Sequence, residues 1–243
     1  MDLNNNIKIT ALLTGRGNNT LKDKNVLPVF GKPLLYYPAK AAWDSKYITE
    51  YYVSSDCEKI LTAAEEIGYS RIKRPLEYAR PDSQHEDVII HALDVLKEKE
   101  EKPDIVVIIL ANNASVKTEW IDDCVKALID DETLTSAIPV YSEMDHHPFR
   151  AKKLNNEGLI DTFFDFKGKK ISTNRQDLEP NYYCCHNFWV LRNNNFDNET
   201  EGQMPWKFMG DRIKPYVIEQ TFDVHESEDI KRVENWLTQN GIV

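Results

Sequence analysis

Cysteine is scarce in this chain of 243 residues, and its four cysteines are poorly spaced for a shared site. Cys57 and Cys124 are isolated, while Cys184 and Cys185 are adjacent, so the sequence contains no C-x-x-C pair. Zinc sites built on cysteine need such pairs, and disulfide-rich secreted domains need a higher cysteine content. The sequence therefore indicates neither a structural zinc site nor a disulfide framework.

Long apolar runs are also missing from the sequence. No segment approaches the roughly 20 consecutive apolar residues that a membrane-spanning helix needs. The opening Met-Asp-Leu-Asn-Asn-Asn has neither the basic nor the apolar region of a secretory signal. We therefore expect a cytoplasmic protein that has no membrane partner.

Positive charge is in deficit, because 30 lysines and arginines face 40 aspartates and glutamates, for a formal net charge of −10. A surface of this sign repels phosphate on average, which argues against nucleic acid as a partner. A local cluster of cations inside an acidic protein suits a small polyanion instead.

The rest of the composition, with 41% hydrophobic and 29% charged residues, is typical of a globular protein with one sizeable core. Up to residue 142, strand-like apolar runs alternate with helical segments, two of which should begin near Pro33 and at a cap formed by Asp56. This alternation predicts an α/β fold with a Rossmann-like, mostly parallel sheet and helices on both faces. We expect residues 1–243 to form a single domain.

The alternation of strands and helices is lost between residues 142 and 182. Two strand-like segments there flank Asn155-Asn-Glu-Gly158, which is a hairpin signal. We expect this part of the chain to be inserted into the domain as a lid or a dimerisation arm.

The first strand-like segment, residues 7–13, is followed by a loop rich in turn residues. This loop matches neither G-x-x-x-x-G-K-[ST] nor G-x-G-x-x-G. Gly15 and Gly17 nonetheless allow the backbone to approach an oxyanion closely. Three cations of the loop could neutralise such a charge: Arg16, Lys22 and Lys24. Composition leaves two interpretations open, a phosphate site or an ordinary surface loop with solvated cations.

Further polar segments follow the later strands, and ligands of such sheets bind beyond the carboxyl ends of the strands. Asn112 and Asn113 follow the most apolar strand, and their amides offer the donors and acceptors that a nucleobase edge requires. Asparagine is equally a favoured turn residue, so a simple turn is the alternative.

Taken together, these segments resemble the CMP-acylneuraminate (CMP-sialic acid) synthetase family of cytidylyltransferases. That family opens with A-R-G-G-S-K-G-I-P-R-K-N and then G-x-P-L, where this chain has residues 14–25, ending in Lys24-Asn25, and then Gly31-Lys-Pro-Leu34. Arg74-Pro75 corresponds to R-P, and Glu143-Met-Asp-His-His-Pro148 corresponds to E-x-x-H-H-P. The resemblance is collinear from residue 7 to residue 239. The loop is one residue short, so either Arg16 aligns with the family's arginine across a gap or Gly15 takes that place.

The resemblance implies a fold of the nucleotide-diphospho-sugar transferase type. It also implies transfer of CMP from CTP to a 2-keto-3-deoxy sugar acid, a sialic-acid-like nonulosonate, with release of pyrophosphate. Lys24 and Arg16 are the implied catalytic cations, and Lys24 would stabilise charge on the α-phosphate and the leaving group. The nucleotide-binding residues implied by the family's pattern are Gly17, Asn18, Asn25, Arg74, Asn112 and Asn113.

The same resemblance assigns substrate residues to the second half of the chain. Arg150 follows the H-H-P motif, and Arg175 stands where arginine precedes Q-x-L, so both would contact the sugar carboxylate. The inserted segment would make these contacts across a homodimer interface. Asn187 stands where relatives have N-G before a strand, and it completes the expected substrate site.

The family holds its divalent metal with D-x-D, and this chain has Asp223-Val-His225 in that place. Mg²⁺ is a hard ion that prefers oxygen ligands, whereas Mn²⁺ accepts an imidazole more readily. Three outcomes remain open: metal held by Asp223 and the triphosphate alone, Mn²⁺ bound also by His225, or reduced activity with His225 as a capping or surface residue.

Two other functions stay open beside CMP transfer. The altered base-contact segment at Asn112 and Asn113 allows a nucleotidyltransferase of the same fold that uses another nucleoside triphosphate or a sugar phosphate. The change to His225 allows a weakly catalytic relative that binds a sugar nucleotide.

Overall fold

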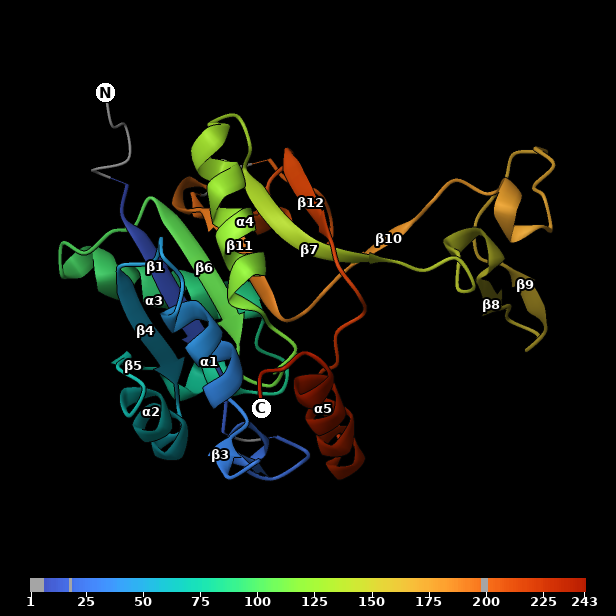
Figure 1. The fold of residues 1–243 in the computed structure, drawn as a ribbon. Helices are drawn as coiled ribbons and strands as arrows, with labels where there is room; N and C mark the ends of the chain where they lie inside the picture. Colours follow the sequence, from blue (N-terminus) through green and yellow to red (C-terminus); the bar gives the residue numbers. More distant parts are fainter. Residues whose placement is uncertain (1–6, 18, 198–200) are drawn as a thin grey trace.

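The computed structural model describes residues 7–17, 19–197 and 201–243. These residues form an eight-stranded mixed sheet covered by helices, with an arm that extends away from it (Figure 1). The strands follow one another in the order β5-β4-β1-β6-β11-β7, with β12 and β10 also bonded to β7. This architecture confirms the predicted α/β class.

The first strand lies at the centre of a parallel half-sheet. β1 (Ile9–Thr14) is bonded on one side to β4 (Glu50–Ser55) and on the other to β6 (Ile105–Leu110). β5 (Ser70–Lys73) continues the sheet beyond β4. Because all four strands run in the same direction, the loops after them meet at one edge of the sheet, where predicted site residues follow β1, β5 and β6.

Helices cover both faces of this half-sheet. α1 (Tyr36–Trp43), α2 (Glu58–Glu65), α4 (Thr118–Asp130) and α5 (Ser227–Gln239) pack on one core, and α3 (His85–Glu98) packs on the other. Successive residues of β6 alternate between the two cores, which explains why that strand is apolar throughout. Among the helices of the described residues, none is both long and apolar enough to cross a membrane.

The other half of the sheet contains the two strands of opposite direction. β11 (Phe188–Arg192) lies antiparallel between β6 and β7 (Ser136–Ser142), and β12 (Ile213–Val217) pairs in parallel with β7. β10 (Tyr182–Cys184) runs antiparallel to the end of β7. The sheet is therefore mostly parallel, as predicted.

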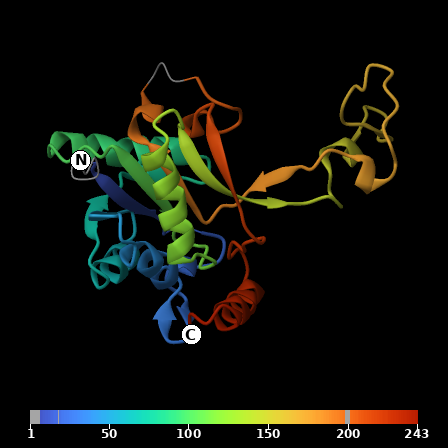
Figure 2. The ribbon, with the colours of Figure 1, turned by 45° about the horizontal axis from the view of Figure 1, so that its top comes forward.

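Residues 143–181 leave the sheet at the end of β7 and return through β10 as a projecting arm (Figures 1 and 2). The predicted hairpin is present as β8 (Lys152–Leu154) and β9 (Ile160–Thr162). Its turn is closed by the Asn155 side chain, which accepts a hydrogen bond of 2.9 Å from the Leu159 N–H, and by Gly158 with φ of 76°. Glycine adopts this left-handed conformation without a steric penalty.

The expectation for Pro33 was wrong, because α1 begins three residues later. Pro33 belongs instead to a two-stranded ribbon of β2 (Pro28–Val29) and β3 (Lys32–Pro33). Phe30 and Gly31 have φ of 45° and 76°, which makes the tight turn that brings these strands together. The ribbon links the glycine-containing loop to α1.

Candidate functional site

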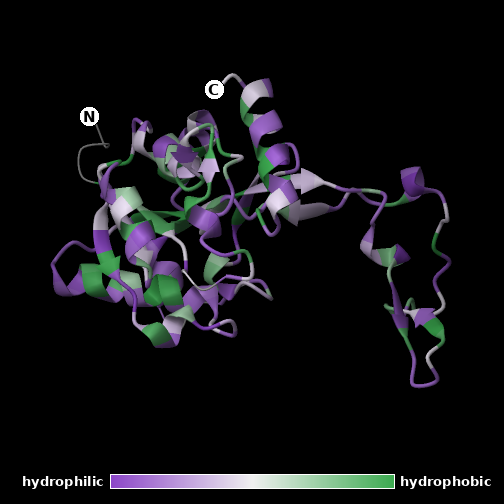
Figure 3. Cartoon of the chain, turned by 90° about the horizontal axis from the view of Figure 1, so that it is seen from below, coloured by the Kyte–Doolittle hydropathy of each residue, from purple (hydrophilic) through white to green (hydrophobic). Residues whose placement is uncertain are grey.

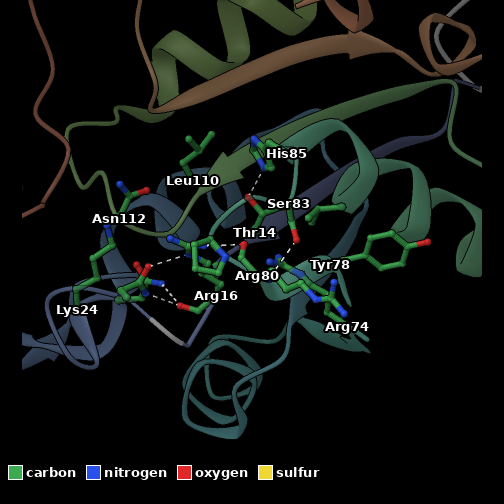
Figure 4. A pocket seen from close by; sticks show the side chains of 15 residues that line it. Thr14, Arg16, Lys24, Arg74, Tyr78, Arg80, Ser83, His85, Leu110 and Asn112 are labelled. Atoms are coloured by element: carbon green, nitrogen blue, oxygen red, sulfur yellow. Dashed lines mark hydrogen bonds between the residues drawn. The ribbon is translucent and has the colours of Figure 1, made fainter. Parts of the chain in front are cut away.

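A cavity of about 330 Å³ lies at the carboxyl ends of β1, β5 and β6 (Figure 4). The loop after β1 forms one wall, the segment from Arg74 to His85 forms another, and Asn112 follows β6. Four cations line it: Arg16, Lys24, Arg74 and Arg80. None of these cations forms an ion pair with a carboxylate of the described residues.

Side-chain amides shape the loop that carries Arg16. The backbone carbonyl of Arg16 accepts hydrogen bonds from Asn19 Nδ2 at 2.6 Å and from Asn25 Nδ2 at 3.1 Å. Arg16 Nε in turn donates to Asn19 Oδ1, and Arg16 Nη1 donates to the Arg80 carbonyl at 2.8 Å. The Arg16 side chain is therefore held between Asn19 and Arg80, and Asn25 helps to order the loop.

Gly17 has a steric role in the same loop. A Cβ at this position would lie 2.7 Å from Cys57 Cβ, so only glycine lets the loop approach the start of α2. The Gly17 N–H donates to Asp56 Oδ1 at 2.9 Å and thus points to this carboxylate. Asn18, which was predicted beside it, lies outside the described residues.

The prediction that Asp56 caps α2 was wrong. Cys57 occupies the cap position without a side-chain bond, and the Asp56 carboxylate is used by the Gly17 N–H instead. Gly17, whose N–H binds this carboxylate, is 39 residues away from Asp56 in the sequence. The local sequence around Asp56 therefore does not reveal this contact.

Two of the cations are held in places that disfavour their charge. Arg74 is 5% exposed and donates to the Ser54 carbonyl at 2.6 Å, and burial together with the nearby Arg16 lowers its pKa to about 10 despite the opposing charge of Asp56. Burial also lowers the pKa of Lys24, while the charge of Asp223 opposes that shift. Charged groups in such surroundings are stabilised when an anion binds beside them.

Lys24 connects the cavity to the predicted metal residues. Its Nζ donates to the Val224 carbonyl at 3.0 Å, so it lies between the loop after β1 and the Asp223-Val-His225 segment. Asp223 borders a second cavity of about 290 Å³, and its pKa is raised by burial while a hydrogen bond from Asn113 acts in the opposite direction. The predicted catalytic residues Arg16, Lys24 and Asp223 therefore come together in one region.

The predicted metal pair offers a limited set of donors. Asp223 Oδ2 and His225 Nε2 are 3.9 Å apart, and the His225 side chain is 70% exposed. Among the described residues, no group of three or more histidines, cysteines, aspartates or glutamates is arranged to hold a metal ion. A divalent ion here would need most of its ligands from a bound molecule, and phosphate oxygens are suitable ligands for Mg²⁺.

The asparagines predicted to contact ligands separate into two groups. Asn112 lines the first cavity, so it remains available to a ligand. Asn113 and Asn187 are fully buried, and their side chains bond within the protein. Asn113 binds Asp223 and neighbouring groups, and Asn187 donates to the Ser115 carbonyl at 2.9 Å. The structure therefore gives Asn113 and Asn187 positions in the framework rather than at the cavity surface.

Arg150 and Arg175 lie on the arm, away from both cavities of the same chain (Figure 1). Both arginines bind Asp145: Arg150 Nη1 donates to its carbonyl at 3.3 Å, and Arg175 pairs with its carboxylate. One chain alone thus does not bring these arginines to Lys24.

Several residues that line the first cavity were absent from the predicted site, and three of them are Tyr78, Arg80 and His85. His85 is the first residue of α3, and its Nε2 is 2.9 Å from Thr14 Oγ1. Its ring also packs on Trp189, with 5.4 Å between ring centroids. One feature of the sequence could have indicated them. All three lie in or just after the loop that begins at Arg74, and this loop is at the edge of the sheet where ligands bind.

The surroundings of His85 predict a pH dependence of stability. Desolvation, with the charges of Arg74 and His186, lowers its pKa from 6.5 to about 4, so the unfolded chain binds this proton first as the pH falls. The free energy of unfolding should therefore decrease between pH 6.5 and 4. Denaturant unfolding of His85→Gln should show a smaller decrease across this range than the unmodified chain, and equal slopes would contradict this assignment.

Solved structures of nucleotidyltransferases share this fold. The structure of CMP:2-keto-3-deoxy-manno-octonic acid synthetase complexed with CTP superposes with a TM-score of 0.70 and 16% identity, covering 96% of this chain and 99% of the other. The 4-diphosphocytidyl-2C-methyl-D-erythritol synthase of Anaerococcus prevotii superposes with a TM-score of 0.65 and 15% identity, covering 96% of both chains. At these identities, the likeness concerns the fold.

The sequence profile of the cytidylyltransferase family matches residues 16–237, and the chain belongs to this family. The chain is 25% identical over 176 residues to the Helicobacter pylori pseudaminic acid cytidylyltransferase and UDP-2,4-diacetamido-2,4,6-trideoxy-beta-L-altropyranose hydrolase, which is 72% of this chain and 32% of that protein. It is 26% identical over 169 residues to the N-acylneuraminate cytidylyltransferase of Streptococcus agalactiae, covering 69% of this chain and 39% of that protein. The chain thus spans about a third of the length of these curated relatives.

Proposed function

We propose that this chain transfers CMP from CTP to a 2-keto-3-deoxy sugar acid of the nonulosonate kind and releases pyrophosphate. The observation that carries the proposal is the cavity beside Asp223, whose four cations form no ion pair with a carboxylate in the part of the chain that the structure describes. A nucleoside triphosphate supplies the negative charge that these cations require. Relatives named for N-acylneuraminate and pseudaminic acid support the class of the acceptor.

In this reaction the anomeric hydroxyl of the sugar acid attacks the α-phosphate, and pyrophosphate leaves. Arg16 and Arg74 bind the phosphates from two sides of the cavity, and Lys24 stabilises the charge that grows on the α-phosphate and the leaving group. Asn112 lies at the carboxyl end of β6, where its amide is available to the base. The protein thus acts mainly by positioning and by electrostatic stabilisation.

Asp223 is the residue that would hold a divalent ion, Mg²⁺ or Mn²⁺, together with oxygens of the triphosphate. One carboxylate oxygen is bonded to Asn113, and the other faces His225 across 3.9 Å. When bound, the ion would neutralise phosphate charge. His225 would add a nitrogen ligand that suits Mn²⁺ better than Mg²⁺.

The proposal is tested by incubating the purified protein with CTP, Mg²⁺ or Mn²⁺ and a panel of 2-keto-3-deoxy acids. We expect pyrophosphate to appear only with an acid that is a substrate, together with a CMP-linked product. The same assay with UTP, GTP or ATP should release none. If CTP binds and yet no acid supports release, the proposed reaction is refuted.

We further propose that the arm pairs two copies of the chain. Hydrophobic stretches alternate with hydrophilic ones along it (Figure 3). On its hairpin, Leu154 and Ile160 are directly opposite one another and are 71% and 73% exposed. Burying these side chains against a second copy would stabilise a homodimer and bring Arg150 and Arg175 to the neighbour's site, where a sugar carboxylate needs a cation.

Replacing both Leu154 and Ile160 with lysine should convert the dimer into a monomer in sedimentation velocity. Pyrophosphate release should then fall on the order of 10²-fold, because two arginines no longer reach the substrate. Met204→Lys is the matched control, since Met204 is 75% exposed on the body of the protein, lines neither cavity and should leave both properties unchanged. An unmodified chain that is monomeric and fully active would refute the role of the arm.

A second candidate function follows from the exposed His225. With one carboxylate in the predicted metal pair, the chain could bind a sugar nucleotide without turning it over efficiently. A His225→Asp variant separates the two candidates. Turnover that appears only in the variant supports the binding function, whereas substantial turnover by the unmodified chain supports the enzyme.

A further inference from the structure

The segment that carries Asp223 lacks regular secondary structure. Between the end of β12 at Val217 and the start of α5 at Ser227, the chain forms neither helix nor strand. The position of the Asp223 carboxylate therefore depends on individual contacts. Two of them are to consecutive asparagines after β6: Asn112 O accepts from the Val224 N–H at 2.9 Å, and Asn113 Nδ2 donates to Asp223 Oδ1 at 2.8 Å.

Asn113 joins three segments that are far apart in the sequence. Besides Asp223, its Nδ2 lies 3.2 Å from the His186 carbonyl and 3.3 Å from Thr221 Oγ1. Its own Oδ1 accepts from the Ser115 N–H at 3.0 Å, and the residue is fully buried. Both sides of the amide are thus used, which fixes its orientation as well as its position.

The bond to Asp223 is the shortest of the contacts made by Asn113 Nδ2, and it is the only one to an ionisable group. Hydrogen bonds to a charged acceptor are stronger than those between neutral groups. With Oδ1 held by the amide, Oδ2 is the carboxylate oxygen that faces His225 in the second cavity. The geometry therefore leaves Oδ2 available to a ligand and directs it toward the second cavity.

We propose that Asn113 is a positioning residue that holds Asp223 Oδ1 so that Oδ2 is presented to the divalent ion bound with CTP. This inference rests on the proposed function, because that function supplies the ion. Asn113 acts through Asp223 and does not contact the nucleotide, whereas its neighbour Asn112 lines the nucleotide cavity. The two consecutive asparagines therefore have separate tasks.

The test compares Asn113→Ala with Asn112→Ala by measuring the dissociation constant of Mn²⁺ in the presence of CTP, from the electron paramagnetic resonance signal of free Mn²⁺. Loss of a hydrogen bond to a charged group should weaken Mn²⁺ binding about tenfold or more in Asn113→Ala. CTP affinity measured without metal should change less than about twofold in this variant, since the cavity itself is intact. Asn112→Ala should show the opposite pattern.

Saturating Mn²⁺ should restore most of the turnover of Asn113→Ala, as expected for a defect in metal affinity rather than in folding. If the alanine variant does not fold, Asn113→Ser keeps a short donor and should show an intermediate loss of Mn²⁺ affinity. Equal Mn²⁺ affinity in the unmodified chain and in the folded Asn113 variant overturns the inference alone. Failure of the unmodified chain to bind Mn²⁺ with CTP overturns both this inference and the proposed function.

Discussion

Replacing Lys24 with methionine is expected to lower kcat by about 10²–10³-fold, the cost of removing one group that stabilises charge in the transition state. The Lys24 side chain lies between the first cavity and Asp223, and burial already lowers its pKa. Methionine retains the apolar stem and removes the charge together with the hydrogen bond to the Val224 carbonyl. Single-turnover release of pyrophosphate measures the chemical step directly.

Lys22 provides the matched control for this substitution. It belongs to the same loop but is exposed and does not line the cavity. Lys22→Met should therefore change kcat less than about twofold, since exposed charges contribute little at physiological salt. If both variants lose activity equally, the loop acts through its overall charge, and the specific role of Lys24 is refuted.

Asp223→Asn is expected to remove metal-dependent turnover and to stabilise the ligand-free protein. The amide keeps the shape and the acceptor for Asn113, but it is a poor ligand for the ion, so turnover should fall on the order of 10²-fold or more. Burial raises the pKa of Asp223, so its ionised form costs free energy in the fold. A gain on the order of 1 kcal/mol would raise Tm by about 2–4 °C in a chain of this size.

The stability gain of Asp223→Asn should depend on pH in a defined direction. Because the pKa is raised in the folded state, the cost of the carboxylate is present above that pKa and disappears below the ordinary value of 3.8. Thermal unfolding of both proteins without ligand should therefore differ at neutral pH and converge in acid. A variant that is less stable than the unmodified chain at pH 7 would contradict this account.

The fold was predictable because each signal was local and repeated. Apolar runs such as Ile105–Leu110 alternate with amphipathic segments, and this pattern determines a doubly covered parallel sheet. The antiparallel insertion of β11 between β6 and β7 was not predicted. The order of strands in a sheet depends on contacts between distant segments. The hydrophobic periodicity of a single segment carries no information about these contacts.

The candidate site was predictable where its residues lie in one loop. Arg16, Lys24 and Asn25 come from a single loop after β1, and the structure brings them to one cavity. Asn113 and Asn187 were expected at the ligand surface, yet they are fully buried in the framework. A short motif gives the residue type at each position, but the direction of a side chain is set by partners that lie far away in the sequence.

A crystal structure of the chain grown with CTP and Mn²⁺ tests the central claim most directly. The account predicts triphosphate oxygens within hydrogen-bonding distance of Lys24 Nζ and an anomalous Mn²⁺ peak beside Asp223. CTP bound elsewhere, with Lys24 still donating to the Val224 carbonyl, would contradict it.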